Sequence, residues 1–402
     1  MTIKRDITTE TEKYLETDEM LIFVGARQAG KTTILKQIQG ELEVSGSLCY
    51  FLNLDDPQYL SLLDDHPRNL LKIFSLNLEV RNFIFVDEIQ YLKDPSNFLK
   101  YIFDEYGGKI KLIVSGSSAF YIDKKFKDSL AGRKKIFHVN TLSFAEFLRF
   151  KGEVDLSHKD FDKVGLDEAN KLDLLYREFM LFGGYPRVVL APLEEKENIL
   201  KELAYSYIKK DIYEANIKQE EVFYALFKIL AGQVGNLVNA SELANTLNVS
   251  KSSIDNYLYT MKKSYHIALV SPFFRNARKE LSKMPKVFFC DTGLRNFFVG
   301  NMTPFELRSD KGQLLENAVF RQLTERYGLE GIRFWRTTAR KEVDFIVQDK
   351  FAFEVKTSVG QFKNSKYDAF RRAYPEIKFS VVSIGATEKV LGDVTVIDPW
   401  QV

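Results

Sequence analysis

Short apolar segments alternate with longer amphipathic segments over the first 150 residues of the chain. Five of the apolar segments have the length of a buried strand: residues 20–24, 47–54, 83–87, 110–116 and 135–140. The stretches between them have the helical spacing of apolar positions. Because strands separated by helices usually join a parallel sheet, the pattern predicts an α/β domain over residues 1–150.

The pattern changes after this region. Residues 151–171 are polar, charged and without periodicity, which indicates a domain boundary. Residues 172–232 then have helical spacing, interrupted by Gly183, Gly184 and Pro186. This segment predicts a small helical region between the first domain and the rest of the chain.

Two closely spaced helical patterns follow within residues 239–270, separated by a short turn at residues 248–250. Such spacing packs two short helices across a tight turn, so it predicts a helix-turn-helix. The second helix would present Lys251, Ser252 and Ser253 to a nucleic-acid groove. The last hundred residues return to mixed helical and strand patterns.

Composition narrows the class of protein. The chain of 402 residues is 45% hydrophobic and 28% charged, as soluble globular proteins are. Its 57 basic and 55 acidic residues nearly balance, so any affinity for nucleic acid must come from local clusters. Two separated cysteines and four scattered histidines exclude a disulfide framework and argue against a His or Cys metal site. Without a long apolar run or a signal-peptide pattern, we expect a cytoplasmic protein with no membrane partner.

A phosphate-binding loop follows the first predicted strand. The pattern G-x-x-x-x-G-K-[ST] is met by Gly25, Ala26, Arg27, Gln28, Ala29, Gly30, Lys31 and Thr32, with Thr33 next to it. Backbone N–H groups of such a loop surround the phosphates of ATP, and the following helix adds its positive end. Lys31 would reach the β- and γ-phosphates, and the Thr32 hydroxyl would bind Mg²⁺.

A second part of an ATP site follows the third predicted strand. Residues 83–88 form a buried strand pattern that ends in Asp87 and Glu88. Asp87 would hold Mg²⁺ through water or Thr32, while Glu88 would activate the attacking water. Ser115 ends another strand, where it would sense the γ-phosphate, although a serine-rich turn without that role is nearly as good an interpretation.

These segments together resemble one family. The runs G-A-R-Q-A-G-K-T-T, F-V-D-E-I-Q, S-G-S-S-A, L-A-G-R and F-G-G-Y-P look like those of the prokaryotic AAA-type ATPases that carry an uncharacterised C-terminal domain. The resemblance implies an ATPase with a helical lid, and it matches Arg133 to the Gly-Arg position of the family. An arginine finger at Arg133 would require a homo-oligomer or a closing lid; the alternative is a surface arginine in a basic loop.

A basic segment follows the helix-turn-helix. It contains one acidic residue, Glu280, and five basic ones: Arg275, Arg278, Lys279, Lys283 and Lys286. Such a hairpin, with Phe273 and Phe274 at its base, predicts a winged helix-turn-helix that contacts DNA phosphates. The alternative is a winged helix used only for packing inside an ATPase.

A carboxylate set lies near the C-terminus. Asp344, Glu354 and Lys356 fall in two strand-like segments, and alternation puts Glu354 and Lys356 on one face. With Glu316 on the preceding helix, this resembles the D…E-x-K set of the restriction-endonuclease-like superfamily. The resemblance implies a site for Mg²⁺ or Mn²⁺ at Glu316, Asp344 and Glu354, with Lys356 serving the hydrolytic water. A domain that only binds nucleic acid is the alternative.

The leading interpretation is an ATPase that binds DNA and couples its nucleotide state to a nuclease-like domain. The rival is a nucleotide-controlled switch or signalling scaffold whose accessory domains contact proteins without cutting DNA. The predicted domains are an AAA-type ATPase domain at 1–150, a helical lid at 151–235, a winged helix-turn-helix at 236–300 and a restriction-endonuclease-like α/β domain at 301–402.

Overall fold

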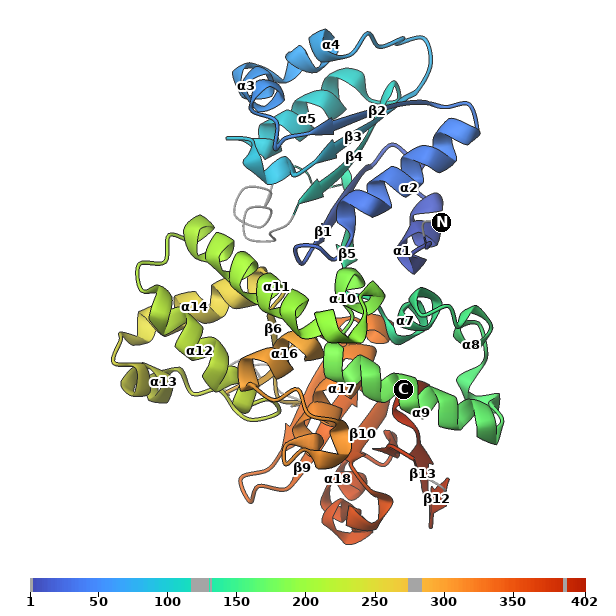
Figure 1. The fold of residues 1–402 in the computed structure, drawn as a ribbon, viewed down its shortest axis with the longest axis vertical. Helices are drawn as coiled ribbons and strands as arrows, with labels where there is room; N and C mark the ends of the chain where they lie inside the picture. The colour runs from blue at the N-terminus through green and yellow to red at the C-terminus, as the bar shows by residue number, and fades with distance from the viewer. Residues whose placement is uncertain (1–2, 117–129, 131, 274–283, 386–388) are drawn as a thin grey trace. The chain divides into compact units, whose positions relative to one another are not determined.

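The computed structural model describes residues 3–116, 130, 132–273, 284–385 and 389–402 (Figure 1). The chain divides into two compact units. The N-terminal unit contains Met1–Thr141 with Lys263–Tyr265, and the C-terminal unit contains Leu142–Lys262 with His266–Val402. Among the helices of the described residues, none is both long and apolar enough to cross a membrane.

The N-terminal unit is a parallel five-stranded sheet in the order β2-β3-β4-β1-β5. Its strands are β1 (Met20–Gly25), β2 (Leu48–Asn53), β3 (Asn82–Asp87), β4 (Ile110–Gly116) and β5 (Lys134–Val139). Its helices are α1 (Asp6–Glu12), α2 (Lys31–Val44), α3 (Pro57–Asp65), α4 (Leu70–Ile73) and α5 (Pro95–Tyr106). The five predicted strands and their parallel arrangement are therefore confirmed.

The central strands are buried on both faces, because apolar side chains pack against helices on either side of the sheet. One apolar cluster includes α5, and the other includes α2. Since the paired strands are parallel and in register, the carboxyl ends of β1, β3 and β4 meet at one edge. Ligands of open α/β sheets bind at this edge.

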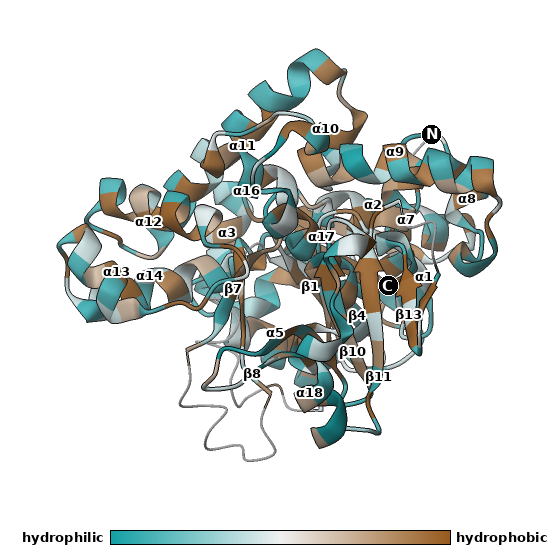
Figure 2. Ribbon diagram, turned by 90° about the horizontal axis from the view of Figure 1, so that it is seen from below, coloured by the Kyte–Doolittle hydropathy of each residue, from teal (hydrophilic) through white to brown (hydrophobic). Residues whose placement is uncertain are grey.

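The C-terminal unit begins with a layer of helices. They are α7 (Phe144–Phe150), α8 (Val154–Ser157), α9 (Leu166–Phe182), α10 (Pro186–Leu190), α11 (Leu193–Glu214), α12 (Glu220–Gly232), α13 (Ala240–Leu247), α14 (Lys251–Lys263) and α16 (Thr292–Val299). Between α14 and α16, the strands β6 (Ile267–Val270) and β7 (Lys286–Phe289) pair antiparallel. In Figure 2, α9 and α11 carry both hydrophilic and hydrophobic residues, as helices with one buried face do.

The glycines of the F-G-G-Y-P segment end α9 and permit a close backbone approach. Gly183 has a φ of 74°, and the N–H of Gly184 donates to Asp291 Oδ2 at 2.8 Å. The Gly184 carbonyl accepts a hydrogen bond from the N–H of Leu142 at 2.7 Å. A side chain on either glycine would collide with Asp291 or with the backbone of Leu142. The break predicted at these glycines therefore joins the end of α9 to two distant segments.

A second sheet closes the chain, in the order β12-β13-β11-β10-β9-β8. Its elements are α17 (Lys311–Tyr327), β8 (Ile332–Arg336), β9 (Glu342–Val347), β10 (Phe351–Lys356), α18 (Asp368–Ala373), β11 (Lys378–Ser383), β12 (Val390–Leu391) and β13 (Val394–Ile397). The strands β8, β9 and β10 form an antiparallel meander, and β11 then adds parallel to β10. This order brings the segments that contain Asp344 and Glu354 into adjacent strands.

The domain division differs from the prediction beyond the first domain. The predicted boundary at residue 150 falls at Thr141 in the structure. One continuous cluster of buried side chains then runs from Leu142 to Val402, through the helices, the β6–β7 hairpin and the second sheet. The three segments predicted as separate domains therefore share a single core, because each leaves an apolar face that only its neighbours cover.

Candidate nucleotide site and C-terminal carboxylate cluster

The loop between β1 and α2 has the backbone conformation that a phosphate-binding loop needs. Gln28 and Gly30 have positive φ values of 51° and 100°. A Cβ atom on Gly25 would lie 2.0 Å from the Val139 carbonyl oxygen, so this position requires glycine. Gly30 directly precedes α2, and the loop therefore ends at a helix N-terminus where N–H groups are free of intrahelical bonds.

Lys31 is held against the loop itself. Its ammonium group donates to the carbonyl oxygens of Gly25 at 3.1 Å and Ala26 at 2.9 Å. The residue is only 5% exposed. This places a cation within the loop, where anionic phosphates would be bound.

The predicted polar groups at the strand ends converge. Thr32 Oγ1 donates to Asp87 Oδ2 at 2.6 Å, and the Ser115 hydroxyl donates to the other oxygen of Asp87. The backbone N–H of Glu88 donates to Ser115 Oγ at 3.4 Å. Three residues from α2, β3 and β4 thus form one hydrogen-bonded group beside the loop, as the spacing of the motifs predicts.

Glu88 follows this group in a left-handed conformation, with a φ of 59°. Its carboxylate accepts a hydrogen bond from the Gln90 amide, a partner that the sequence motifs do not identify. A non-glycine residue at positive φ is uncommon and occurs often at functional sites. The backbone strain and the Gln90 contact together fix the direction of the Glu88 carboxylate.

The donor set beside the loop fits Mg²⁺. Thr32 supplies a hydroxyl and Asp87 supplies a carboxylate, and both are oxygen ligands of the type that this hard cation prefers. Asp87 accepts its side-chain hydrogen bonds from two neutral hydroxyl groups, so its negative charge is not cancelled by them. A nucleotide phosphate would complete the ligands around such an ion.

Arg5 also contacts the loop, and no motif indicated it. It is 6% exposed, and its guanidinium donates to the carbonyls of Ala29 at 2.7 Å and Asn140 at 3.0 Å. The three residues are far apart in the sequence. Their meeting depends on the docking of α1, which a short polar segment does not predict.

Arg133 lies at the other end of the sheet. It directly precedes β5, whose first residue, Lys134, pairs with Met20 at the start of β1, whereas the loop follows the end of β1. Its Nε donates to Asp104 at 3.0 Å, and its guanidinium lies 5.8 Å from the ring centre of Phe103. Arg133 therefore does not reach the loop of its own chain, and a finger role stays a prediction for a neighbouring subunit.

The two helices predicted within residues 239–270 are α13 and α14, while a winged helix-turn-helix stays a prediction. Ser250 caps α14, because its hydroxyl accepts from the N–H of Ser253 at 3.1 Å, and Lys251 and Ser252 are exposed. Phe274 and the basic residues Arg275, Arg278, Lys279 and Lys283 lie outside the described residues. Lys286 does not belong to a DNA-facing surface: it is 1% exposed and surrounded by acids, so this part of the prediction is wrong.

The D…E-x-K residues do come together on β9 and β10. The Val355 N–H donates to Asp344 Oδ2 at 2.9 Å, and the Asp344 N–H donates to Glu354 Oε2 at 3.4 Å. The Lys356 ammonium donates to Glu354 and, at 3.1 Å, to the Val355 carbonyl. Tyr367 donates to the same Glu354 oxygen at 2.7 Å. The predicted face shared by Glu354 and Lys356 is confirmed.

A metal site at Glu316, Asp344 and Glu354 stays a prediction. Within the part of the chain that the structure describes, no group of three or more acidic, His or Cys side chains is placed to hold a metal ion. The Lys286 ammonium instead lies 3.2 Å from Glu316, 2.6 Å from Glu342 and 3.8 Å from Asp344. An internal cation thus lies beside Glu316 and Asp344, whereas Glu354 is paired with Lys356.

Burial dominates the electrostatics of this cluster. It raises the pKa of Glu316 to about 8, with Asp344 adding to the rise and Lys286 opposing it. It also raises the pKa of Glu354 to about 7, again with Asp344 adding and Lys356 opposing. The surrounding carboxylates outweigh the cost of burial for Lys286, so the pKa of its ammonium is raised. Lys286 therefore remains charged at every physiological pH.

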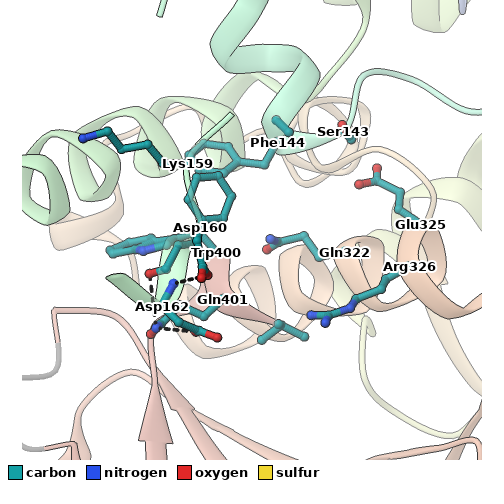
Figure 3. Close-up of a pocket in the computed structure, with 13 residues that line it drawn as sticks. Ser143, Phe144, Lys159, Asp160, Asp162, Gln322, Glu325, Arg326, Trp400 and Gln401 are labelled. Carbon is teal, nitrogen blue, oxygen red and sulfur yellow. Dashed lines mark hydrogen bonds between the residues drawn. The ribbon is translucent and has the colours of Figure 1, made fainter. Parts of the chain in front are cut away.

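A pocket of about 430 Å³ opens elsewhere in the C-terminal unit (Figure 3). Its lining includes Phe144, Gln322, Arg326 and Trp400, which Figure 3 shows around the opening. It contains none of the predicted site residues. The position of the pocket therefore adds nothing to the chemistry of the two clusters above.

One family model matches the region that contains the candidate nucleotide site. Residues 17–148 match the family model described as AAA domain. Two further models, both described as domains of unknown function (DUF8612 and DUF4143), match residues 173–304 and 311–400. Residues 17–148 are therefore similar to an AAA domain.

Two relatives align with most of this chain. An uncharacterized protein of Methanocaldococcus jannaschii is 28% identical over 398 residues, covering 95% of this chain and 84% of its own length. Another, from Haemophilus influenzae, is 26% identical over 347 residues, covering 84% and 81%. Both alignments therefore extend well beyond residues 17–148.

Two solved structures show a looser likeness. The ADP form of the Aeropyrum pernix ORC2 protein has a TM-score of 0.38 at 13% identity, covering 75% of this chain and 95% of its own. AMPPCP-bound DnaA from Aquifex aeolicus has a TM-score of 0.30 at 14% identity, covering 64% and 86%. TM-scores below 0.5 establish neither a shared function nor shared partners.

Proposed function

We propose that this protein hydrolyses ATP with Mg²⁺ at the loop of its AAA-type domain. The observation that supports this most directly is the hydrogen-bonded group of Thr32, Asp87 and Ser115, which lies beside a phosphate-binding loop containing a buried lysine. Structural stability alone does not require a carboxylate with two hydroxyl donors at this edge of the sheet.

Each residue of the site has a distinct part in the reaction. The loop N–H groups and Lys31 bind the β- and γ-phosphates, and Thr32 and Asp87 hold Mg²⁺, which neutralises charge on the phosphates when bound. Glu88 orients the attacking water and accepts its proton. Ser115 fixes Asp87 and the backbone of Glu88, so it links the metal-binding and water-activating residues.

Two substitutions test these parts separately. Lys31→Ala should abolish ATP binding, because it removes the cation that bridges the phosphates. Glu88→Gln should bind ATP normally and hydrolyse it about 10²-fold or more slowly, the size of a lost general base. Binding is measured with a fluorescent ATP analogue and hydrolysis by phosphate release, with the exposed Glu79→Gln as a matched control. Hydrolysis by Glu88→Gln at the wild-type rate would show that another residue activates the water.

We further propose that the nucleotide state controls a C-terminal unit that binds DNA. The helix-turn-helix supports this, because the start of α14 presents Lys251 and Ser252 to solvent. The strands β9 and β10 carry the D…E-x-K residues of the nuclease-like prediction, but Lys286 lies beside Glu342 and Asp344. The pattern therefore favours a module that binds without cutting, or a switch that contacts another protein. In a homo-oligomer, Arg133 of one subunit could contact the γ-phosphate of ATP bound to a neighbouring subunit.

The salt dependence of DNA binding decides between these two candidates. Neutralising Arg275, Arg278 and Lys279 together should weaken binding to all sequences and flatten the salt dependence, because fewer counterions are released. A matched variant neutralises three exposed basic residues near α18, Lys363, Lys366 and Arg372. It should leave the DNA affinity and its salt dependence unchanged. A protein that hydrolyses ATP but has no salt-sensitive DNA affinity would instead be the switch.

A further inference from the structure

The phosphate-binding loop is supported from behind by the first segment of the chain. Arg5 precedes α1, which packs beside α2 in Figure 1. Its guanidinium is buried and donates to the carbonyl of Ala29, the residue before Gly30 in the loop. The same guanidinium donates to the carbonyl of Asn140, directly after β5. One side chain thus fastens the loop to the end of the neighbouring strand.

The position of this contact matters because of peptide chemistry. The carbonyl of Ala29 and the N–H of Gly30 belong to the same planar peptide unit. A charged donor on the carbonyl oxygen polarises that unit, so its N–H becomes a stronger donor toward a phosphate on the other side. The guanidinium is also close: a Cβ atom on Gly30 would lie 3.6 Å from Arg5 Nη1.

The contact also restricts the conformation of the loop. Gly30 has a φ of 100° and no side chain that could hold its backbone in place. Gln28 is also in a left-handed conformation. A hydrogen bond to the peptide between Ala29 and Gly30 therefore fixes the most permissive part of the loop. The loop carbonyls of Gly25 and Ala26 are already taken by Lys31, so the loop is held from two directions.

We propose that Arg5 is a positioning residue for nucleotide binding, which keeps the loop in its phosphate-binding conformation and strengthens its N–H donors. This inference rests on the proposed ATPase function and assigns a role to a residue outside all the motifs. Arg5 acts on the bound phosphates through the loop and touches no reacting atom. Loss of the Arg5 guanidinium therefore weakens the binding of ATP and the binding of ADP to a similar degree. It also raises the KM for ATP more than it lowers kcat.

A neighbouring contact supplies a matched control. Gln37 Nε2 donates to the Ile3 carbonyl at 2.9 Å, so it fastens the same N-terminal segment to α2 without contacting the loop. Gln37→Met loosens this segment and retains the guanidinium. Arg5→Met removes the guanidinium and retains a side chain of similar length. A role limited to docking the segment would make these two variants equivalent.

The experiment measures binding of fluorescent ATP and ADP analogues to the full chain, followed by KM and kcat for ATP. Arg5→Met should raise both dissociation constants about tenfold or more, the effect of losing a charge-assisted hydrogen bond. Its kcat should stay within threefold of the wild-type value. Arg5→Lys retains a cation but cannot donate to both carbonyls as the guanidinium does, so its dissociation constants should lie between those of the wild-type protein and those of Arg5→Met. Gln37→Met should stay within threefold of wild type in every measurement.

Three outcomes would overturn the proposal: ATP binding by Arg5→Met within threefold of wild type, an equal loss in Gln37→Met, or a fall in kcat at unchanged KM. If Arg5→Met does not fold, Arg5→Lys carries the test, because wild-type affinity in that variant contradicts a need for the guanidinium. Absence of ATP binding by the wild-type protein would instead refute the proposed function itself.

Discussion

The close packing of α16 against the end of α9 can be tested with one methyl group. A Cβ atom on Gly293 would lie 2.1 Å from the carbonyl oxygen of Phe182, and both atoms belong to backbone or are attached directly to it. A carbon–oxygen contact needs about 3.3 Å. In Gly293→Ala the two segments must therefore separate by about 1 Å, since no flexible side chain can yield.

The cost follows from what this separation breaks. Asn296 Nδ2 on α16 donates to the carbonyls of Met180 at 3.0 Å and Leu181 at 2.9 Å, and a shift of about 1 Å would lengthen both bonds beyond useful range. Overpacking costs about 1–3 kcal/mol, and each lost hydrogen bond adds about 1 kcal/mol. Alanine recovers only about 0.5–1 kcal/mol through helix propensity. A net loss of about 2–4 kcal/mol predicts a Tm lower by at least about 5 °C.

Gly312→Ala is the matched control, because Gly312 is the second residue of α17 just as Gly293 is the second residue of α16. A Cβ atom there meets nothing within 4 Å, so this variant should be as stable as wild type or more stable by about 0.5–1 kcal/mol. Both tryptophans, Trp335 and Trp400, belong to the C-terminal unit, so their fluorescence follows its unfolding. Equal Tm values for the two variants would refute the packing argument.

The remaining predictions concern the C-terminal carboxylate cluster. Lys286→Met should bind Mn²⁺, because Glu342 and Asp344 lose their internal cation, and Mn²⁺ should then raise the Tm of this variant in the absence of nucleotide. Adding Asp344→Asn should abolish this rise in Tm. If Mn²⁺ leaves the Tm of folded Lys286→Met unchanged, the proposed role of the lysine is wrong. Glu354→Gln should gain stability relative to wild type as the pH rises from about 5 to 8. In the folded wild-type protein Glu354 keeps its proton up to a pKa of about 7, whereas in the unfolded chain it releases the proton at a lower pH. The wild-type protein therefore loses stability as the pH rises between these two values. A constant difference in Tm between the two proteins from about pH 5 to 8 would be inconsistent with the raised pKa.

Local patterns predicted the N-terminal unit well, for a physical reason. The central strands β1 and β3 are apolar runs that are buried on both faces of the parallel sheet, and β3 ends at Asp87. The convergence of Thr32, Asp87 and Ser115 follows from strand order and parallel direction alone. Arg5 could not be found in this way, because its partners lie in the loop and after β5, and only tertiary docking joins them.

Lys286 shows why the C-terminal unit was harder to predict. In the sequence it belongs to a basic run, and a basic run usually faces solvent or nucleic acid. In the structure it is the first residue of β7, where the strand enters the core and Glu316 and Glu342 approach from distant segments. Burial of a lysine is determined by such partners, which composition along the chain does not reveal.

The two carboxylate sites of this protein contain similar residue types, but the groups that contact their acidic side chains differ. Asp87 accepts from two neutral hydroxyls, which orient its oxygens without cancelling its charge, so it can still attract a cation. At the second sheet, the cations Lys286, Lys356 and Arg336 already bind the carboxylates around Asp344. A divalent ion would gain little there, since it must displace charges that are fixed and mostly buried. The physical difference between the two sites is therefore the charge of the groups that contact the carboxylates: neutral hydroxyls at Asp87, and cations around Asp344.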